Sequence, residues 1–207
     1  MPGGPPPDLR LPPFPCLPAL AAQPPPGPPF LPTALTRFRL FSRVQSIDDF
    51  CLWAPHAKAS VGDAEASVVS YCLKAGHGSR LMPSGTLTGV HWVNTDRYLQ
   101  ITGTGDFTKL NIPKGDQGGE LDPHGADGNG NPKGGLVITN HRGKNEQILE
   151  WTQFISYNQF CIRACYHKDG DKSWCNHIYD VMGCEWNMPA NCERGWRRLG
   201  GSGARVC

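Results

Sequence analysis

The residues best suited to chemistry lie in one glycine-rich segment, where Glu120, Asp122 and His124 stand two positions apart. Carboxylates and an imidazole at close range are the groups that enzymes use for general acid and base catalysis. The segment therefore predicts a hydrolytic site built on Asp122 and His124, with Glu120 beside them. The chain contains no G-x-S-x-G, H-E-x-x-H or P-loop motif, so the sequence indicates no known enzyme class.

The same segment concentrates oxygen ligands of the kind that calcium prefers. Asp127, Asn129 and Asn131 occupy alternate positions, with glycines between them that allow tight turning. The pattern departs from an EF-hand, because counting from Asp127 places Pro132 where that loop needs glycine and Ile138 where it needs a bidentate glutamate. The alternative is a surface loop whose side chains bond their own backbone. Apart from calcium, no cofactor is expected.

Cysteines indicate the compartment. Of the nine in the chain, Cys16, Cys192 and Cys207 lie in atypical terminal segments. The remaining six are Cys51, Cys72, Cys161, Cys165, Cys175 and Cys184. An even number in a small glycine-rich domain is typical of disulfides formed in an oxidising environment.

Six cysteines allow 15 pairings, and spacing favours one set. Cys161 and Cys165 stand four apart on a predicted helix, so they share a face and reach across to a second segment. The favoured bonds are Cys165–Cys175 nested inside Cys161–Cys184, with Cys51–Cys72 joining the N-terminal segments. Each would stabilise the fold by about 2–4 kcal/mol.

Zinc is the competing hypothesis for the four C-terminal cysteines, with His167 and His177 nearby. No C-x-x-C knuckle occurs, and the cysteine spacings fit no common zinc motif. The disulfide interpretation is therefore preferred.

Helices are predicted at both ends of the domain that carries these residues. A short helix is expected over 50–53 after a capping box at 46–49, and a second begins at Gly62 and ends near Gly76. Apolar residues at helical spacing predict a long helix over 146–166, and another is expected over 173–182.

Between these helices the sequence changes to a β pattern. Strands are expected at 88–93, 98–102, 107–112 and 135–139, separated by glycine and Asx turns. The predicted fold class is α+β: a small antiparallel sheet with disulfide-tied helices at both ends. Trp53 and Trp151 are expected in its core.

The two ends of the chain differ from this domain. Residues 1–43 hold 14 of the 20 prolines and are predicted to be extended and disordered. Residues 192–207 are rich in arginine and glycine, and the same is expected there. Both are typical of translated non-coding sequence around a genuine domain, 44–191, with real disordered extensions as the alternative. No apolar run reaches the about 20 residues of a membrane span or the about 7–15 of a secretory signal.

Charge is divided in the same way. Residues 44–191 carry a net charge of −4, whereas each end carries +3. An acidic folded part argues against nucleic acid as a partner. No N-x-S/T sequon occurs, so N-glycosylation is not expected.

Long stretches of the domain resemble a known family. They are VQSIDDFCLWAP, GHGSRLMPSGTLTGVHWV, TGTGDFTKLNIPKGDQGGELDPHGADGNGNPKGGLV and CNHIYDVMGCEWNMPAN, which together extend over 44–191. They are similar to macrophage-activating-glycoprotein-like secreted proteins of basidiomycete fungi. The resemblance implies a secreted or cell-wall-associated fungal protein, and it brings no catalytic residues. Its members have a signal peptide before the domain and a Ser/Thr-rich tail with a lipid anchor after it, and this sequence shows neither.

Three functions follow as hypotheses. The first is a non-enzymatic extracellular protein of the fungal surface, immunomodulatory or engaged with a host, whose acidic loop binds an extracellular ligand or cell-wall glycan. The second is a secreted hydrolase using Glu120, Asp122 and His124, which a deep pocket joining these side chains would favour. The third is a calcium-dependent carbohydrate-binding protein.

Overall fold

The computed structural model describes residues 40–166, 173–190 and 196–198, the last as backbone only, and these form a mainly β fold. Predictions for 1–39, 167–172, 191–195 and 199–207 lie outside the described residues. The strands are β1 (Phe41–Ser46), β2 (Asp49–Ala54), β3 (Val69–Cys72), β4 (Arg80–Leu81), β5 (Leu87–Asn94), β6 (Tyr98–Gly105), β7 (Gly119–Leu121), β8 (Leu136–Thr139), β9 (Glu146–Ile148), β10 (Glu150–Ile155), β11 (Gln159–Cys165) and β12 (Trp196–Arg198). The helices are α1 (Val61–Ala64), the 3-10 turns η1 (Glu65–Ser67) and η2 (Phe107–Leu110), and α2 (Gly183–Asn187).

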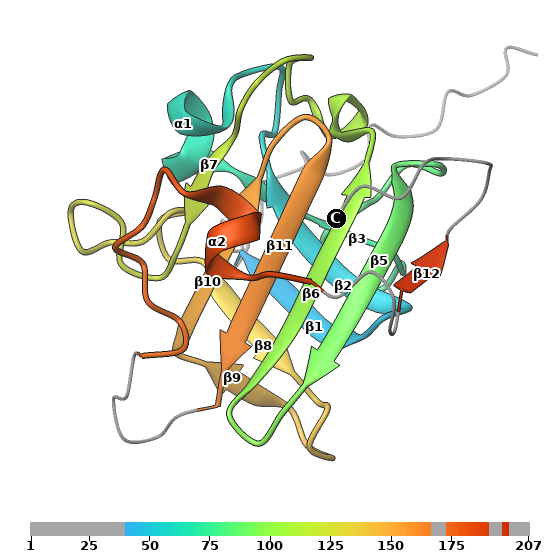
Figure 1. Ribbon diagram of the computed structural model, residues 1–207, viewed down its shortest axis with the longest axis vertical. Coiled ribbons are helices and arrows are strands. Elements are labelled where there is room, and N and C mark those ends of the chain that lie inside the picture. The colour runs from blue at the N-terminus through green and yellow to red at the C-terminus, as the bar shows by residue number, and fades with distance from the viewer. Residues whose placement is uncertain (1–39, 167–172, 191–195, 199–207) are drawn as a thin grey trace, which may run out of the picture. The chain divides into compact units, whose positions relative to one another are not determined.

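Two six-stranded sheets lie face to face (Figure 1). The first has the order β4-β3-β2-β1-β8-β9, and the second β12-β5-β6-β11-β10-β7. Pairing is antiparallel except between β1 and β8 and between β3 and β4. Residues 41–43, at the end of the proline-rich segment, belong to β1, and residues 196–198 of the C-terminal segment pair with β5.

The α+β prediction is wrong in its helices, which do not lie at both ends of the domain. Residues 50–53 form part of β2, and 146–166 contain β9, β10 and β11. In the range 62–76, helical structure ends at Ser67 and β3 follows. Residues 173–182 contain no helix, and 107–110 form a 3-10 turn instead of a strand.

These errors share one physical cause. Strands β2, β10 and β11 are buried on both faces, so their apolar residues run together instead of alternating, and periodicity does not separate such strands from helices. The expected strands over 88–93, 98–102 and 135–139 were easier, and they correspond to β5, β6 and β8.

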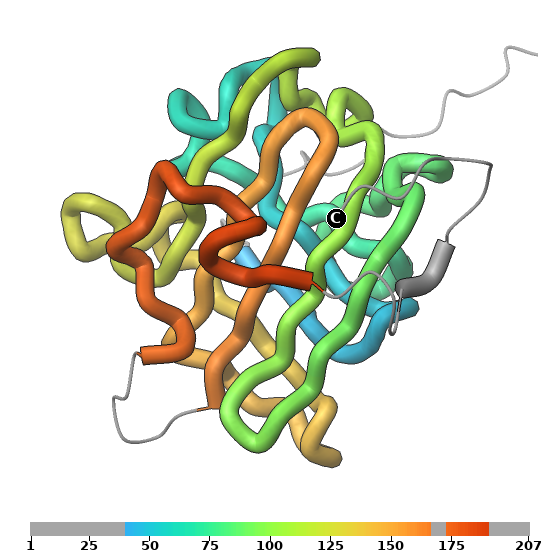
Figure 2. The backbone as a smooth tube through the Cα atoms, viewed as in Figure 1, coloured from blue at the N-terminus to red at the C-terminus, as the bar shows by residue number. Residues whose placement is uncertain are grey.

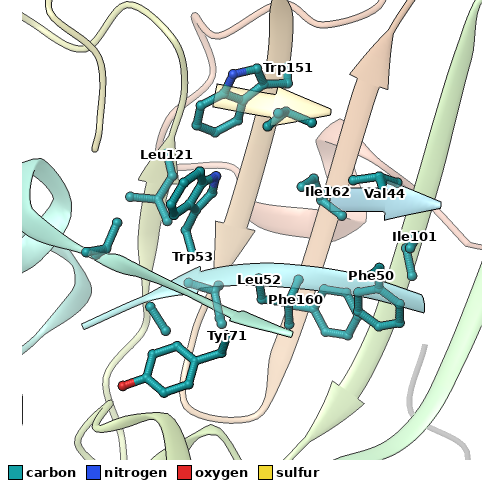
Figure 3. Packing of buried hydrophobic residues seen from close by; sticks show 14 of the residues in the cluster. Val44, Phe50, Leu52, Trp53, Tyr71, Ile101, Leu121, Trp151, Phe160 and Ile162 are labelled. Carbon is teal, nitrogen blue, oxygen red and sulfur yellow. The ribbon is translucent and has the colours of Figure 1, made fainter. Parts of the chain in front are cut away.

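Aromatic side chains fill the space between the sheets (Figure 3). The Phe50 and Phe160 rings stack with centroids 5.7 Å apart, and Trp53 lies 6.1 Å from Trp151. Both tryptophans are buried, as expected, although on strands rather than helices. Fully buried Gln153 adds a polar link: its Oε1 accepts from the Trp53 N–H at 2.9 Å, and its Nε2 donates to the Trp53 carbonyl at 2.8 Å. One side chain of the second sheet thus satisfies both backbone groups of a residue in the first.

Three disulfides are present: Cys51–Cys72, Cys161–Cys184 and Cys165–Cys175. These are the pairs that the cysteine spacing favoured, and they leave none of these cysteines to bind zinc as a thiolate. The helical premise behind that choice was wrong, but residues four apart also share a face in a strand. Cys161 and Cys165 on β11 therefore still point the same way.

Gly118 sets the approach of β7 to β10. Its φ is +92°, and a Cβ there would lie 2.1 Å from the Ile155 carbonyl oxygen. We expect Gly118→Ala to lower the free energy of unfolding by about 2 kcal/mol, because left-handed backbone and a backbone clash add together. Gly115→Ala is the matched control, with φ +86° and no atom within 4 Å of its Cβ, and it should cost about half as much. Urea denaturation measures both, and equal losses would contradict the clash.

Candidate functional site

The outer face of the second sheet, turned away from the first sheet, carries the candidate site. Along β10, Trp151 and Ile155 pack in the core between the sheets, so Thr152 and Phe154 point to the outer face. Glu120 on β7 is the register partner of Phe154 and lies on that same face. A strand face with buried polar groups needs a cover, and the C-terminal part of the chain supplies it.

Residues 173–190, which we call the strap, cross this outer face in front of β10, β11 and β6 (Figure 2). Cys161–Cys184 and Cys165–Cys175 bond the strap to β11. Polar contacts add to this attachment: Arg163 donates to the Trp174 carbonyl at 2.7 Å, and Thr102 donates to the Met188 carbonyl at 3.2 Å. Phe154 and Cys161 of the sheet pack against Cys184 and Met188 of the strap. The strap is therefore fixed covalently at two points and by hydrogen bonds near both ends.

A pocket of about 630 Å³ opens between the strap, β7, the end of β10 and the loop after β7. Four carboxyl groups line it: Glu65 on η1, Glu120 on β7, Asp122 just after β7, and Asp180 on the strap. His177 on the strap also lines it. The volume lies within the range of about 300–1,000 Å³ that is common for small-molecule sites.

Glu120 is the buried acid of this pocket, with 7% of its surface exposed. Thr152 donates to its Oε1 at 2.7 Å, and its side chain is also hydrogen-bonded to Asp180. Burial, the hydrogen bond to Asp180 and the neighbouring charges of Asp180 and Asp122 raise the pKa of Glu120 to about 8. Glu120 is therefore protonated at neutral pH and has a proton to give.

Glu65 reaches the pocket from η1, a segment distant in sequence from β7. The Val61 N–H donates to Asp116 Oδ2 at 2.8 Å, and Asp116 Oδ1 accepts from the Gly118 N–H, so one side chain joins the start of α1 to the strand that carries Glu120. Burial raises the pKa of Glu65, while its hydrogen bond with Asn131 opposes the shift. The carboxyl groups thus come from three separate segments that the tertiary structure brings together.

Of the three residues predicted to form an acid–base cluster, Glu120 and Asp122 line the pocket and His124 stands beside it. Asp122 has a structural role as well, since its Oδ1 accepts from the backbone N–H groups of His124 and Gly125 at 2.7 and 2.8 Å. His124 Nε2 lies 3.0 Å from Glu150 Oε2, and its ring stacks on His177. His177, not His124, is the imidazole on the pocket wall.

The predicted calcium ligands have different surroundings from one another. Asp127 pairs with Lys133 at 2.9 Å and accepts from the Asn129 N–H, and these contacts lower the pKa of Asp127 to about 2. Asn131 instead lines the pocket and hydrogen-bonds Glu65. Asp127 and Asn129 are exposed and bond their own backbone, as the surface-loop alternative expected.

Sequence reasoning missed Glu65, Asp180 and His177. No motif marks them, because each lies more than 50 residues along the chain from Glu120 on β7. Two of them, His177 and Asp180, belong to the strap, whose position depends on its disulfides. The one usable signal was the cysteine pairing: if Cys184 bonds Cys161, residues just before Cys184 must lie over β11 and its neighbours.

Apolar side chains are exposed on the strap beside the pocket. Val181 lines the pocket and is 94% exposed, and Tyr179 and Trp186 are 46% and 60% exposed. The rings of Tyr179 and Trp186 meet edge to face at 6.2 Å. Exposed apolar groups that border a pocket are a mark of ligand-binding surfaces.

Glu120 should make stability depend on pH. Its pKa is about 8 in the folded protein against an ordinary 4.5, so between these values the unfolded chain releases a proton that the folded protein keeps. Stability is therefore full below about pH 4.5 and falls as pH rises towards 8. We expect a loss on the order of 2 kcal/mol, less than half of what the whole shift would give, because the pocket is open to water.

Urea denaturation of the wild type and Glu120→Gln at pH 5 and pH 8 measures this loss. Glutamine does not titrate, and the neighbouring Asp180, Asp122 and Glu65 are common to both proteins, so the difference between their pH dependences isolates Glu120. Parallel pH profiles would show that Glu120 is already ionised in the folded protein.

Together the fold and the pocket define a class of protein: a mainly β domain with three disulfides, whose carboxyl-lined pocket is bordered by a disulfide-bonded strap. No protein-family model matches the chain, and no solved structure matches it. In the described residues no helix is long and apolar enough to cross a membrane.

Two fungal proteins of the smut fungus Mycosarcoma maydis are homologous to this chain. Appressorium protein ROW2 is 55% identical over 156 residues, which are 73% of this chain and 54% of ROW2. Appressorium protein ROW1 is 54% identical over 156 residues, which are 73% of this chain and 37% of ROW1. The chain thus spans about half of the first relative and just over a third of the second.

These homologues correct the resemblance drawn from the sequence. They are appressorium proteins, not macrophage-activating-glycoprotein-like proteins, so that family assignment was wrong. The coarser expectation of a fungal protein of host interaction agrees with them, and their names state no molecular activity.

Proposed function

We propose that this chain is a domain of a secreted or cell-wall-associated fungal protein that acts in host interaction, and that its pocket hydrolyses glycosidic bonds. The relatives named for the appressorium support the first part, and the disulfides support an oxidising compartment. The second part develops the hydrolase hypothesis, with partners for Glu120 that the sequence alone did not indicate.

One observation carries the proposal: Glu120 is held protonated in a pocket that holds other carboxyl groups. A carboxylic acid with a raised pKa, next to a second carboxyl group, is the pair with which glycosidases cleave acetals. A carboxyl group buried in the pocket keeps its proton and can act as the acid, whereas a carboxyl group in contact with solvent loses its proton and can act as the base. Among described cysteines, none competes as a nucleophile, because all six are disulfide-bonded.

The roles follow from position. Glu120 would protonate the oxygen of the leaving sugar as the bond from that oxygen to the anomeric carbon breaks. Water would then attack the anomeric carbon, and its proton would pass to the carboxyl group of Glu65, which lines the pocket from η1 and is not hydrogen-bonded to Glu120. Thr152 would hold the Glu120 side chain in place through its 2.7 Å hydrogen bond.

A glycan is the substrate class that the surroundings fit best. The pocket wall includes the side chains of Gln117, Asn131 and Gln159, which can hydrogen-bond hydroxyl groups. Tyr179 and Trp186 offer exposed rings on the strap next to it. Polar groups inside the pocket and exposed aromatic rings on the strap suit a polyhydroxylated chain that extends beyond the pocket.

The test is the release of reducing ends from β-glucan and chitin by the full chain between pH 4 and 9. The proposal expects activity that declines above about pH 8 as the Glu120 proton is lost. Calorimetry with the same glycans runs beside it, with and without calcium. Binding without cleavage would replace the hydrolase by a glycan-binding domain, which the exposed strap aromatics favour as the second candidate. If the chain neither cleaves nor binds these glycans, both the hydrolase and the glycan-binding candidate are overturned.

A further inference from the structure

Beside the pocket, three side chains that the proposed hydrolysis does not use stand together: His124, Glu150 and His177. We propose that they form a binding site for one divalent transition-metal ion, with Zn²⁺ as the best match. This site is distinct from the Glu120 carboxyl pair, and it goes beyond the proposed function.

The geometry is close to that of a bound ion. One ligand atom from each residue lies within 4.8 Å of the others, and His124 Nε2 is 3.0 Å from Glu150 Oε2. The rings of His124 and His177 face each other with centroids 4.7 Å apart at 27°. The ligand atoms of a tetrahedral zinc ion stand about 3.3 Å apart, given bonds of about 2.0–2.1 Å. Small rotations of the side chains would reach that arrangement.

Each ligand is positioned by a different element. His124 follows the turn in which Asp122 accepts two backbone N–H groups. Glu150 begins β10, and its side chain lies on the same outer face as Thr152. His177 is two residues from Cys175, which is bonded to β11. A turn, a strand and a disulfide thus hold the three groups before any ion arrives, which lowers the cost of ordering them.

The ligand set selects the kind of ion. Two imidazoles and one carboxylate suit zinc and its neighbours in the transition series, whereas calcium and magnesium prefer sets made of oxygen alone. Two histidines with one glutamate are also a known catalytic zinc set that leaves the fourth position open. Because His177 lines the pocket, an open position on its side would be reached from there.

Isothermal titration of the metal-stripped full chain with ZnCl₂ at pH 7.5 tests the site, with CaCl₂ and MgCl₂ as comparisons. The wild type should bind one equivalent of zinc and show no comparable heat with calcium or magnesium. His177→Gln and His124→Gln should each weaken zinc binding by more than about 100-fold, since loss of an outer partner alone costs about 10–100-fold. X-ray absorption of the zinc complex should show two nitrogen ligands and a carboxylate oxygen.

His56→Gln is the matched control, because His56 is exposed and lies far along the chain on the loop after β2. It should bind zinc like the wild type, and circular dichroism should show that all variants remain folded. No stoichiometric zinc binding by the wild type would overturn the proposal. So would variants of His124 and His177 that bind as tightly as the control, which would place the ion elsewhere.

Discussion

Replacing Glu120 with glutamine should lower kcat/KM for glycan cleavage by at least about 100-fold while the fold remains intact. General acid catalysis contributes about 10²–10⁴-fold, and glutamine has no acidic proton to give. The side chain keeps its shape, so its oxygen can still accept from Thr152 and its amide can donate to Asp180. Loss of activity would therefore report on the proton, not on packing.

The control is Glu146→Gln on β9, in the other sheet, which makes the same substitution outside the pocket. It should leave kcat/KM within about twofold of the wild type, as expected for a change far from the reacting groups. Substrates with an activated leaving group, which need little protonation, should recover part of the rate in Glu120→Gln. Equal activity of Glu120→Gln and the wild type would remove Glu120 from the mechanism.

Removing the Cys161–Cys184 disulfide with paired alanine substitutions should lower the free energy of unfolding by about 3 kcal/mol and also lower the pKa of Glu120. The first effect follows from the sequence separation of 23 residues that the bond closes. The second follows because Asp180 is four residues before Cys184, and a loosened strap removes both the burial and the neighbouring charge that raise the pKa of Glu120. Carbon-13 NMR titration of the side-chain carboxyl measures that pKa.

Cys51–Cys72 provides a matched control. It closes a similar loop, with a separation of 21 residues, but it joins β2 to β3 in the other sheet. Its removal should cost about as much stability by urea denaturation, while the pKa of Glu120 stays near 8. If both double variants shifted the pKa of Glu120 equally, the strap would not be what sets it.

Part of the candidate site could be predicted because its signal is local. Glu120 and Asp122 stand in a glycine-rich segment where acidic residues are conspicuous, and both line the pocket. The loop around Asp127 and Asn129 also follows local rules, since Asx side chains bond the backbone two residues on. Such interactions need no knowledge of distant segments.

The rest depends on contacts between distant parts of the chain. Glu65, Glu120 and Asp180 meet only because η1 packs near β7 and the strap is bonded across β11. The raised pKa of Glu120 is a property of that meeting, since a lone glutamate in a flexible loop would titrate near its ordinary value.

By itself, the sequence determined the disulfide chemistry, the acidic charge of the domain and the turn-rich loops, because these depend on residue type and short spacing. It also marked the strands over 88–93, 98–102 and 135–139, where glycine and Asx turns bound the β pattern. Only the tertiary structure decided that β2, β10 and β11 are strands and not helices, because a strand covered on both faces loses the alternation that identifies it. The strap covers β10 and β11 on their outer face, and this burial removes the alternation of polar and apolar residues that would have identified them as strands. The same segment forms one wall of the pocket that contains Glu120.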